Sequence, residues 1–176
     1  MKKKDFYPHI EDLFAGHGYR YYPEGKIKGL GRGNRKPDFV AVKDEIFAIG
    51  EIKSPAEPPQ SSSWRSVQPY DSPEMEMVRK KVKELEASGQ VSPEIGGHAI
   101  ILFGQLKEYL SLMGKRWVPP ESPENKTLLL AYAFPSQWSS SVARALEVFG
   151  LNPIQHLKGD LAEAVIFFPK ETFKNF

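Results

Sequence analysis

The sequence of 176 residues contains no cysteine. This absence excludes a disulfide framework, thiolate zinc sites, cysteine nucleophiles and iron–sulfur clusters held by cysteine. The chain also lacks any apolar run near the ~20 residues of a membrane span. Its basic start, Met1–Lys4, continues into charged and aromatic residues instead of the apolar core of a signal peptide. We therefore expect a cytoplasmic protein with no membrane partner.

The chain has no marked excess of charge of either sign. Its 24 basic and 22 acidic residues leave a net charge of +2, which excludes a wholly basic protein of the histone kind but not a local basic patch. Hydrophobic residues make up 40% and charged residues 26%, as in ordinary soluble globular proteins. We expect a single domain over residues 1–176, with a core large enough to fold without covalent staples.

Apolar spacing predicts helices and strands that alternate along the chain. The expected helices are Phe6–Phe14, Pro73–Ala87, Gln105–Met113 and Ser139–Phe149. The expected strands are Tyr19–Tyr22, Phe39–Val42, Ile46–Lys53, His98–Phe103, Thr127–Phe134 and Glu163–Phe168. Pro8 fits the first helix only in its first turn, and Gly16 and Gly18 are expected to end that helix. Prolines exclude regular structure from most of residues 54–73. This order predicts an α/β domain with a mixed sheet.

Three charged residues, Asp38, Glu51 and Lys53, lie at the ends of two apolar strands joined by a short polar connection. Residues i and i+2 of a strand share a face, so Glu51 and Lys53 point the same way. A two-residue turn at Asp44-Glu45 would place Asp38 directly opposite Glu51, with their Cβ atoms roughly 5 Å apart. A three-residue turn would put Asp38 on the other face, although a bulge could restore the shared face.

Two carboxylates at this distance repel each other unless a cation lies between them or one of them takes a proton. Hard oxygen ligands suit Mg²⁺ or Mn²⁺. The ammonium of Lys53 could compensate charge, orient or deprotonate a water, or stabilise charge on a phosphate. A divalent ion beside a lysine suits hydrolysis of a phosphodiester by metal-activated water. The alternative is a surface hairpin with a salt bridge between Glu51 and Lys53.

Pro37-Asp38, followed across the hairpin by Glu51-Ile52-Lys53, resembles the motif of the PD-(D/E)xK nuclease superfamily. The resemblance implies a restriction-endonuclease-like αβββαβ core with a mixed central sheet over residues 1–103. Residues 104–176 would extend this core with an αβαβ segment. The resemblance also implies that Asp38, Glu51 and the backbone carbonyl of Ile52 bind Mg²⁺ or Mn²⁺, and that Lys53 assists the attacking water. The implied activity is that of an endonuclease acting on DNA.

Many members of this superfamily also use an acidic residue from the first helix, for which Glu11 and Asp12 are the candidates. The apolar stripe of that helix centres near Ile10, so Glu11 lies roughly 100° and Asp12 roughly 160° from it. Glu11 can therefore reach the edge of the sheet as a further metal ligand, whereas Asp12 faces water. The alternative is that both residues are solvent-facing helix charges.

A basic segment precedes the motif. Between residues 26 and 36 there is no acidic side chain and there are five basic ones: Lys26, Lys28, Arg32, Arg35 and Lys36. Three glycines in the segment let its backbone approach a ligand closely, and a phosphate backbone would be a natural partner. In the proline-rich loop, Trp64 and Arg65 could stack on or clamp nucleic acid. The alternatives are a solvated basic loop and a simple linker.

Two other functions fit the sequence. One is a catalytically inactive module of the same fold that binds nucleic acid, although pure binding does not require Asp38, Glu51 and Lys53 together. The other is an interaction subunit that acts through residues 127–176. A homodimer is expected by analogy with nucleases that cut both strands as dimers.

Overall fold

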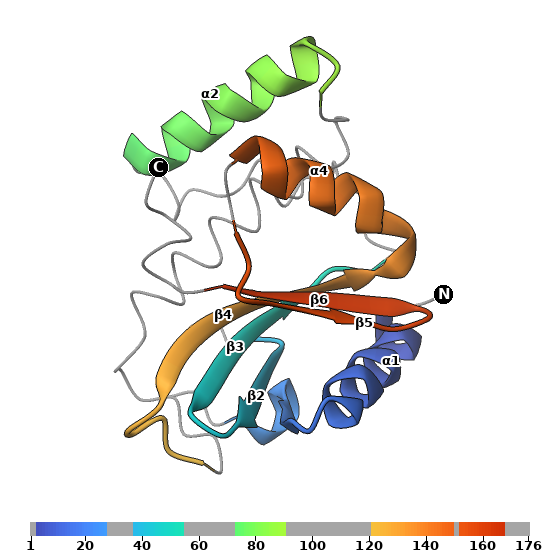
Figure 1. Ribbon diagram of the computed structural model, residues 1–176, viewed down its shortest axis with the longest axis vertical. Helices are drawn as coiled ribbons and strands as arrows, with labels where there is room; N and C mark the ends of the chain where they lie inside the picture. Colours follow the sequence, from blue (N-terminus) through green and yellow to red (C-terminus); the bar gives the residue numbers. More distant parts are fainter. Residues whose placement is uncertain (1–2, 28–36, 55–72, 91–120, 150–151, 168–176) are drawn as a thin grey trace.

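The computed structural model describes residues 3–27, 37–54, 73–90, 121–149 and 152–167 (Figure 1). The helices of these segments are α1 (Lys3–Gly16), α2 (Pro73–Ala87) and α4 (Ser139–Phe149), with short 3₁₀ turns η1 (Glu24–Lys26) and η4 (Ser136–Trp138). The strands are β1 (Arg20–Pro23), β2 (Phe39–Lys43), β3 (Ile46–Ile52), β4 (Thr127–Pro135), β5 (Gln155–Lys158) and β6 (Ala162–Phe167). Within these segments no helix is long and apolar enough to cross a membrane.

One sheet holds all six of these strands in the order β1-β2-β3-β4-β6-β5. β3 and β4 run parallel, and every other neighbouring pair is antiparallel. α1 lies on one side of the sheet, and α2 and α4 lie on the other (Figure 1). The α/β class with a mixed sheet, expected from the alternation of elements, is therefore confirmed.

Most predicted elements of the described segments lie within a few residues of their expected positions. Two helices, α2 and α4, have the predicted bounds. The apolar pattern does not predict β5, because its four residues are too few to show a period. The predicted strand His98–Phe103 and the predicted helix Gln105–Met113 lie outside the described residues.

The position of β4 differs from the expected division into a core and an extension. The sequence interpretation places Thr127–Phe134 beyond a core of residues 1–103. In the structure β4 pairs directly with β3, from Ile46↔Thr127 to Ile52↔Ala133. β4 is buried over most of its length, as expected for a strand with neighbours on both edges and cover on both faces. The C-terminal segment therefore supplies a central strand of the sheet.

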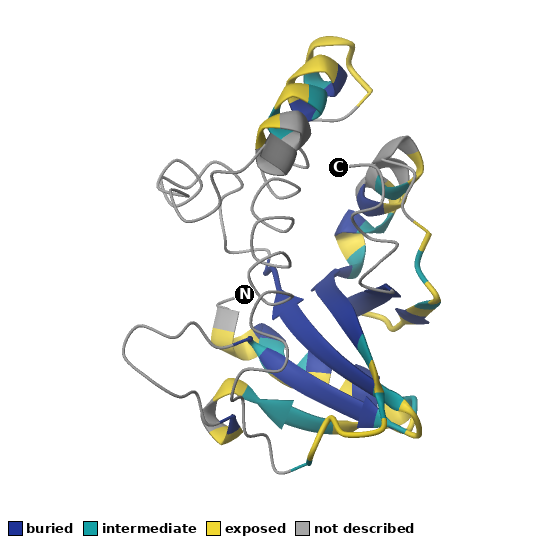
Figure 2. Cartoon of the chain, turned by 90° about the vertical axis from the view of Figure 1, so that its left-hand side faces the viewer, coloured by how far each residue is buried: buried dark blue, intermediate teal, exposed yellow. Residues whose placement is uncertain are grey.

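α1 packs on a face of the sheet that carries small side chains. Phe6, Ile10 and Phe14 of this helix are fully buried, because small residues beneath them let large side chains approach the strands. The alanines of this core are Ala41, Ala48, Ala131, Ala133, Ala162 and Ala164. Phe39 fills the space over Gly50, where a Cβ atom would lie 2.0 Å from the ring. Burial is continuous through the middle of the sheet (Figure 2).

The two ends of α1 agree only in part with those predicted from the sequence. The helix begins at Lys3, so Pro8 lies inside it, beyond the first turn in which it was expected. A proline there removes one backbone hydrogen bond, and its ring is exposed. The predicted end is confirmed, because Gly18 adopts a φ of 83° and its amide donates to the Ala15 carbonyl at 3.0 Å. Glycine reaches this left-handed conformation without strain.

Candidate active site

A two-residue turn joins β2 to β3, the first of the two turn lengths that the sequence left open. Lys43 pairs with Ile46 on either side of it. Asp44 takes a φ of 50° in the turn, a left-handed conformation that aspartate tolerates better than most residues. The hairpin therefore carries Asp38 and Glu51 to the same end of the sheet, away from the turn.

Asp38 departs from the predicted pairing with Glu51. Its amide donates to the Gly50 carbonyl at 3.0 Å, although Gly50 is also the residue opposite Phe39. Two consecutive residues of one strand thus face one residue of the other, which is a β-bulge. The Asp38 carboxylate accepts a hydrogen bond from the Ile52 amide at 2.8 Å. The bulge therefore replaces the predicted direct pairing, and the backbone just after Glu51 holds the Asp38 carboxylate.

Glu51 and Lys53 lie on the face of the sheet opposite α1. Ile52 between them belongs to the core under α1, so the alternation of a strand turns its two neighbours the other way. Lys53 Nζ lies 3.4 Å from Glu51 Oε1, and the two residues are only 7% and 4% exposed. The pair is thus not the solvated surface salt bridge of the alternative interpretation. Taking an ion out of water costs roughly several kcal/mol, which makes a buried pair on an apolar strand an unusual feature.

The backbone of Ile52 faces β2. The Lys53 amide donates to the Ala133 carbonyl on β4 at 2.9 Å, and successive residues of a strand direct their N–H and C=O groups to opposite sides. The Ile52 amide accordingly meets Asp38, and the Ile52 carbonyl points to that same side. The Asp38 carboxylate and the Ile52 carbonyl, two of the predicted oxygen ligands, therefore lie on the side of β3 that faces β2.

Tyr21 connects Asp38 with α1. Its ring stacks on that of Phe39, with 5.1 Å between the centroids. Burial raises the pKa of the Tyr21 phenol, and the negative charges of Asp38 and Glu11 raise this pKa further. The charge of the exposed Glu11 side chain therefore raises the pKa of the same phenol as the charge of Asp38. The tyrosines predict a strand here, but only the folded register shows that Tyr21 lies near the motif.

The basic segment begins beside Asp38. The Glu24 amide, at the start of η1, donates to the Asp38 carbonyl at 3.0 Å. Lys26 at the end of η1 is exposed. The other residues expected to contact nucleic acid lie outside the described residues: Lys28, Arg32, Arg35, Lys36, Trp64 and Arg65.

The chemistry of the candidate ligands fits a hard divalent cation, because Mg²⁺ and Mn²⁺ take carboxylate and carbonyl oxygens. In the described part of the chain, no three His, Cys, Asp or Glu side chains come close enough together to hold a metal by themselves. A cation at this site would therefore depend on the carboxylates of Asp38 and Glu51, completed by the Ile52 carbonyl and by water.

A second polar cluster lies on the same face as Glu51 and Lys53. His156 Nε2 on β5 lies 2.7 Å from Glu163 Oε2 on β6, and the hydroxyl of Ser139, at the start of α4, donates to Glu163 Oε1 at 2.6 Å. Glu163 is 8% exposed. His156 and Glu163 are seven residues apart on neighbouring strands, Ser139 is 24 residues from Glu163, and the three follow no motif spacing. The one signal is that Glu163 interrupts an otherwise apolar strand.

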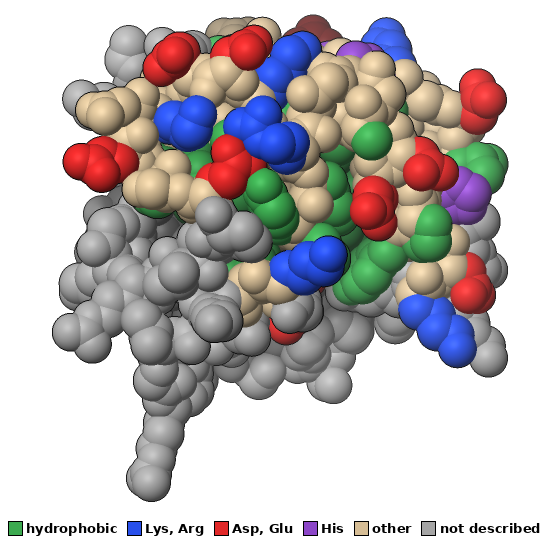
Figure 3. Space-filling model, turned by 90° about the horizontal axis from the view of Figure 1, so that it is seen from below, with side chains coloured by type: hydrophobic (Ala, Val, Ile, Leu, Met, Phe, Trp, Pro, Cys, Tyr) green, Lys and Arg blue, Asp and Glu red, His purple; other side chains and the backbone are tan. Residues whose placement is uncertain are grey.

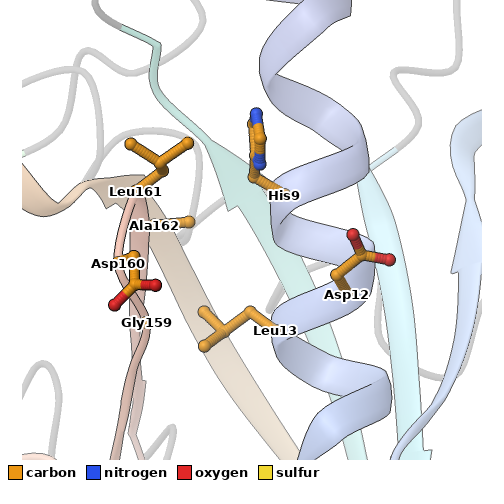
Figure 4. A pocket seen from close by; sticks show the side chains of 7 residues that line it. All are labelled: His9, Asp12, Leu13, Gly159, Asp160, Leu161 and Ala162. Atoms are coloured by element: carbon orange, nitrogen blue, oxygen red, sulfur yellow. The ribbon is translucent and has the colours of Figure 1, made fainter.

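A pocket of about 300 Å³ lies on the other side of the sheet, between α1 and the connection from β5 to β6 (Figure 4). Its lining includes His9, Asp12 and Leu13 from the helix and residues 159–162 from the connection. Seen from below, this side of the molecule carries acidic and basic side chains interspersed with apolar ones (Figure 3). The pocket and the buried charges thus lie on opposite faces of the sheet.

No family model, curated protein or solved structure matches the chain. The interpretation of the site therefore depends on its own residues.

Proposed function

We propose that this protein is a metal-dependent nuclease of the PD-(D/E)xK type that hydrolyses DNA. The observation that carries the proposal is the buried Glu51–Lys53 pair, 3.4 Å apart, beside a bulge that holds the Asp38 carboxylate at the Ile52 amide. Charges buried on an apolar strand are costly. Groups kept at such a cost cluster at functional sites.

The order of the described elements supports the proposal. α1, the antiparallel strands β1–β3, α2 and the parallel neighbour β4 follow the αβββαβ order of a restriction-endonuclease-like core. β4 would then be the last strand of that core, the role that the sequence interpretation gave to His98–Phe103. The motif would lie on two central strands, β2 and β3, at the end opposite their connecting turn.

Each residue of the motif has a distinct role in this proposal. Asp38, Glu51 and the Ile52 carbonyl would hold Mg²⁺ or Mn²⁺, without Glu11, because no three such side chains of the described residues lie close enough together to share a metal. The bound ion would supply Lewis-acid stabilisation of charge on the phosphate and a water of lowered pKa. Lys53 would orient the attacking water or donate a hydrogen bond to a phosphate oxygen. Glu51, next to the ammonium, would keep Lys53 in place.

We also propose how the substrate is bound and where the protein acts. Lys26 and the basic segment that follows it would contact the phosphate backbone of DNA, because they begin beside Asp38. The protein would act in the cytoplasm as an endonuclease, and as a homodimer where both strands are cut.

One observation favours a second candidate, an inactive nuclease-like module that binds nucleic acid or a partner protein. Glu51 and Lys53 are almost fully buried, and a phosphate must reach Lys53 for turnover. A closed ion pair with no turnover would retain the fold and the basic segment while binding DNA without cutting it.

The experiment that tests the proposal uses two matched substitutions in the same hairpin. Asp38→Asn keeps an oxygen that accepts from the Ile52 amide and removes the charge that a metal needs. Asp44→Asn makes the same chemical change at the turn, far from the motif. With Mg²⁺ or Mn²⁺ and plasmid DNA, Asp38→Asn should lose activity by about 10²-fold or more, whereas Asp44→Asn should cut like the parent.

Each outcome decides between the candidates. Addition of EDTA should stop cleavage by the parent, and the two variants should unfold at similar temperatures. Cleavage by Asp38→Asn at the parent rate would show that the site is wrongly assigned. Salt-sensitive DNA binding by the parent without any cleavage would favour the inactive module.

A further inference from the structure

The pocket between α1 and the β5–β6 connection has an apolar floor. Leu13 of α1 and Ala162 at the start of β6 both line it, and these two residues are only 8% and 2% exposed. Leu161, also part of the lining, is 49% exposed. A cavity of about 300 Å³ lies at the lower end of the volumes of small-molecule sites. The pocket therefore suits a short ligand with an apolar part.

Two carboxylates and no lysine or arginine line the same pocket. Asp12 lies on the helix side and Asp160 on the side of the connection (Figure 4). Among the described residues, no hydrogen bond or ion pair holds either carboxylate. An ionised carboxylate only accepts hydrogen bonds, and its strongest partners are cationic donors. The polar part of a ligand in this pocket should therefore carry a positive charge.

The wall that carries Asp160 is formed by the fold itself. Ser136 of η4 holds it, because its hydroxyl donates to the Asp160 carbonyl at 2.7 Å and its amide donates to the Leu161 carbonyl at 3.1 Å. Gly159 in the same connection packs closely on the helix, since a Cβ atom there would lie 3.2 Å from Leu13 Cδ1. The two sides of the pocket are therefore fixed relative to each other without a ligand.

A guanidinium group meets this arrangement better than an ammonium group. It is planar and carries five donors in a fixed fork, so one group can donate to carboxylates on two sides of a pocket. It is also more weakly hydrated than an ammonium, which lowers the cost of placing it next to Leu13 and Leu161. An alkyl stem attached to the group would cover the apolar floor.

We propose that this pocket binds a guanidinium group on a short alkyl stem, with its charge between Asp12 and Asp160. Two sources share this chemistry, a free small molecule and an arginine of a polypeptide, and the test separates them. The inference does not depend on the proposed nuclease function, because the pocket lies on the other face of the sheet from the buried charges of the candidate active site.

The test follows the imidazole NMR signals of His9, which lines the pocket. The full chain is titrated at about pH 8, where histidine side chains ordinarily carry no charge. Butylguanidinium and the peptide acetyl-Gly-Arg-Gly-amide should shift these signals with saturation. Butylurea and the same peptide with citrulline have nearly the same shape and no charge. They should bind about fivefold or more weakly, because each exposed ion pair adds up to about fivefold in affinity.

Two substitutions test the carboxylates. Asp12→Asn and Asp160→Asn keep the size of the side chain and remove its charge. Each should weaken the binding of butylguanidinium by about two- to fivefold and leave both the affinity for butylurea and the unfolding temperature unchanged. Asp44→Asn makes the same chemical change at the turn between β2 and β3, at the other end of the sheet, and should bind like the parent.

The outcomes identify the source or overturn the inference. If the charged ligands bind as expected, tighter binding of the arginine peptide assigns the pocket to a polypeptide, and tighter binding of butylguanidinium assigns it to a free small molecule. Equal binding of butylguanidinium and butylurea would overturn the inference, because the pocket would then select only for an apolar stem. His9 signals that respond to neither charged ligand would also overturn it, even if the parent cuts DNA with Mg²⁺.

Discussion

On the face of the sheet that packs against α1, the central strands carry alanines, and the helix fills the space above them with large apolar side chains. On the opposite face the sheet carries buried charges at Glu51, Lys53 and Glu163. Both faces are buried in the middle of the sheet (Figure 2). The two faces differ in the free energy of burial. Burial of apolar area stabilises the fold by roughly 25 cal/mol per Å², whereas a buried ion costs roughly several kcal/mol of desolvation.

This difference separates the part of the molecule that stabilises the fold from the part to which we assign the proposed chemistry. Aromatic contacts on the α1 face, such as Phe14 to Phe39 at 4.9 Å between centroids, need no explanation beyond packing. The buried charges on the other face do need one, because apolar residues of similar size would stabilise the sheet at least as well. The pocket beside α1 therefore has less claim to catalysis than the charged face.

Removal of one partner of the buried pair should have the largest effect on stability. Lys53→Met leaves the Glu51 carboxylate buried without its ammonium, and we expect the free energy of unfolding to fall by about 3–5 kcal/mol. The double variant Glu51→Leu with Lys53→Met removes both charges and should recover most of that loss, or exceed the parent. Urea denaturation of the parent, the single variant and the double variant measures all three.

The double variant also tests the division between the faces. It should be stable and should lack nuclease activity, because stability on this face does not depend on the charges but the proposed chemistry does. A double variant as unstable as Lys53→Met would mean that the pair is needed for packing, and the contrast between the two faces would fail.

A steric change on the α1 face should have the next largest effect. A Cβ at Gly50 would lie 2.0 Å from the Phe39 ring, so Gly50→Ala forces the ring to move and should destabilise the fold by about 1–3 kcal/mol or more. Phe39→Leu in the same chain removes the end of the ring and should recover part of the loss. Gly16→Ala is the control, because a Cβ there meets no atom within 4 Å. If the chain with both Gly50→Ala and Phe39→Leu is no more stable than Gly50→Ala alone, the Phe39 ring is not the cause of the destabilisation.

The hairpin shows which features of the site could be predicted from the sequence. Two apolar strands with Asp44-Glu45 between them leave few possible registers, and the pairing of Lys43 with Ile46 is one of the two that the sequence left open. The bulge at Asp38 could not be predicted in this way. Its hydrogen bonds, from the Asp38 amide to the Gly50 carbonyl and from the Ile52 amide to the Asp38 carboxylate, form only once both strands are in place.

Long-range pairing limits the rest of the prediction. β4 is recognisable as a strand, but its parallel pairing with β3 joins segments that are far apart in the chain and leaves no local signal. The contact of Ser139 with Glu163 likewise joins two elements that are 24 residues apart, whereas His156 reaches Glu163 within the β5–β6 hairpin. The sequence therefore predicts the motif and the α/β class, whereas the extent of the charged face becomes visible only from the sheet order.

The smallest effect is expected at an exposed ion pair on the edge of the sheet, which provides a solvated reference for the buried pair. Arg20 donates two hydrogen bonds to Glu121, each of 2.7 Å, and Tyr22 donates a third. The hydrogen bonds from Arg20 lower the pKa of Glu121 from 4.5 to about 2. Because the pKa of Glu121 is lower in the folded chain than in the unfolded chain, its carboxylate stabilises the fold at pH values above the unfolded pKa of 4.5. This stabilisation is lost as the pH falls from 4.5 through about 2.

Glu121→Gln should therefore lower the free energy of unfolding by less than about 1 kcal/mol near neutral pH, because water screens an exposed pair. The difference between this variant and the parent should shrink below pH 4.5 and vanish only below about pH 2, as measured by urea denaturation as the pH is lowered. A loss as large as that of Lys53→Met would mean that solvent exposure does not set the difference between the two pairs. The burial of Glu51 and Lys53 would then no longer mark their face as the functional one.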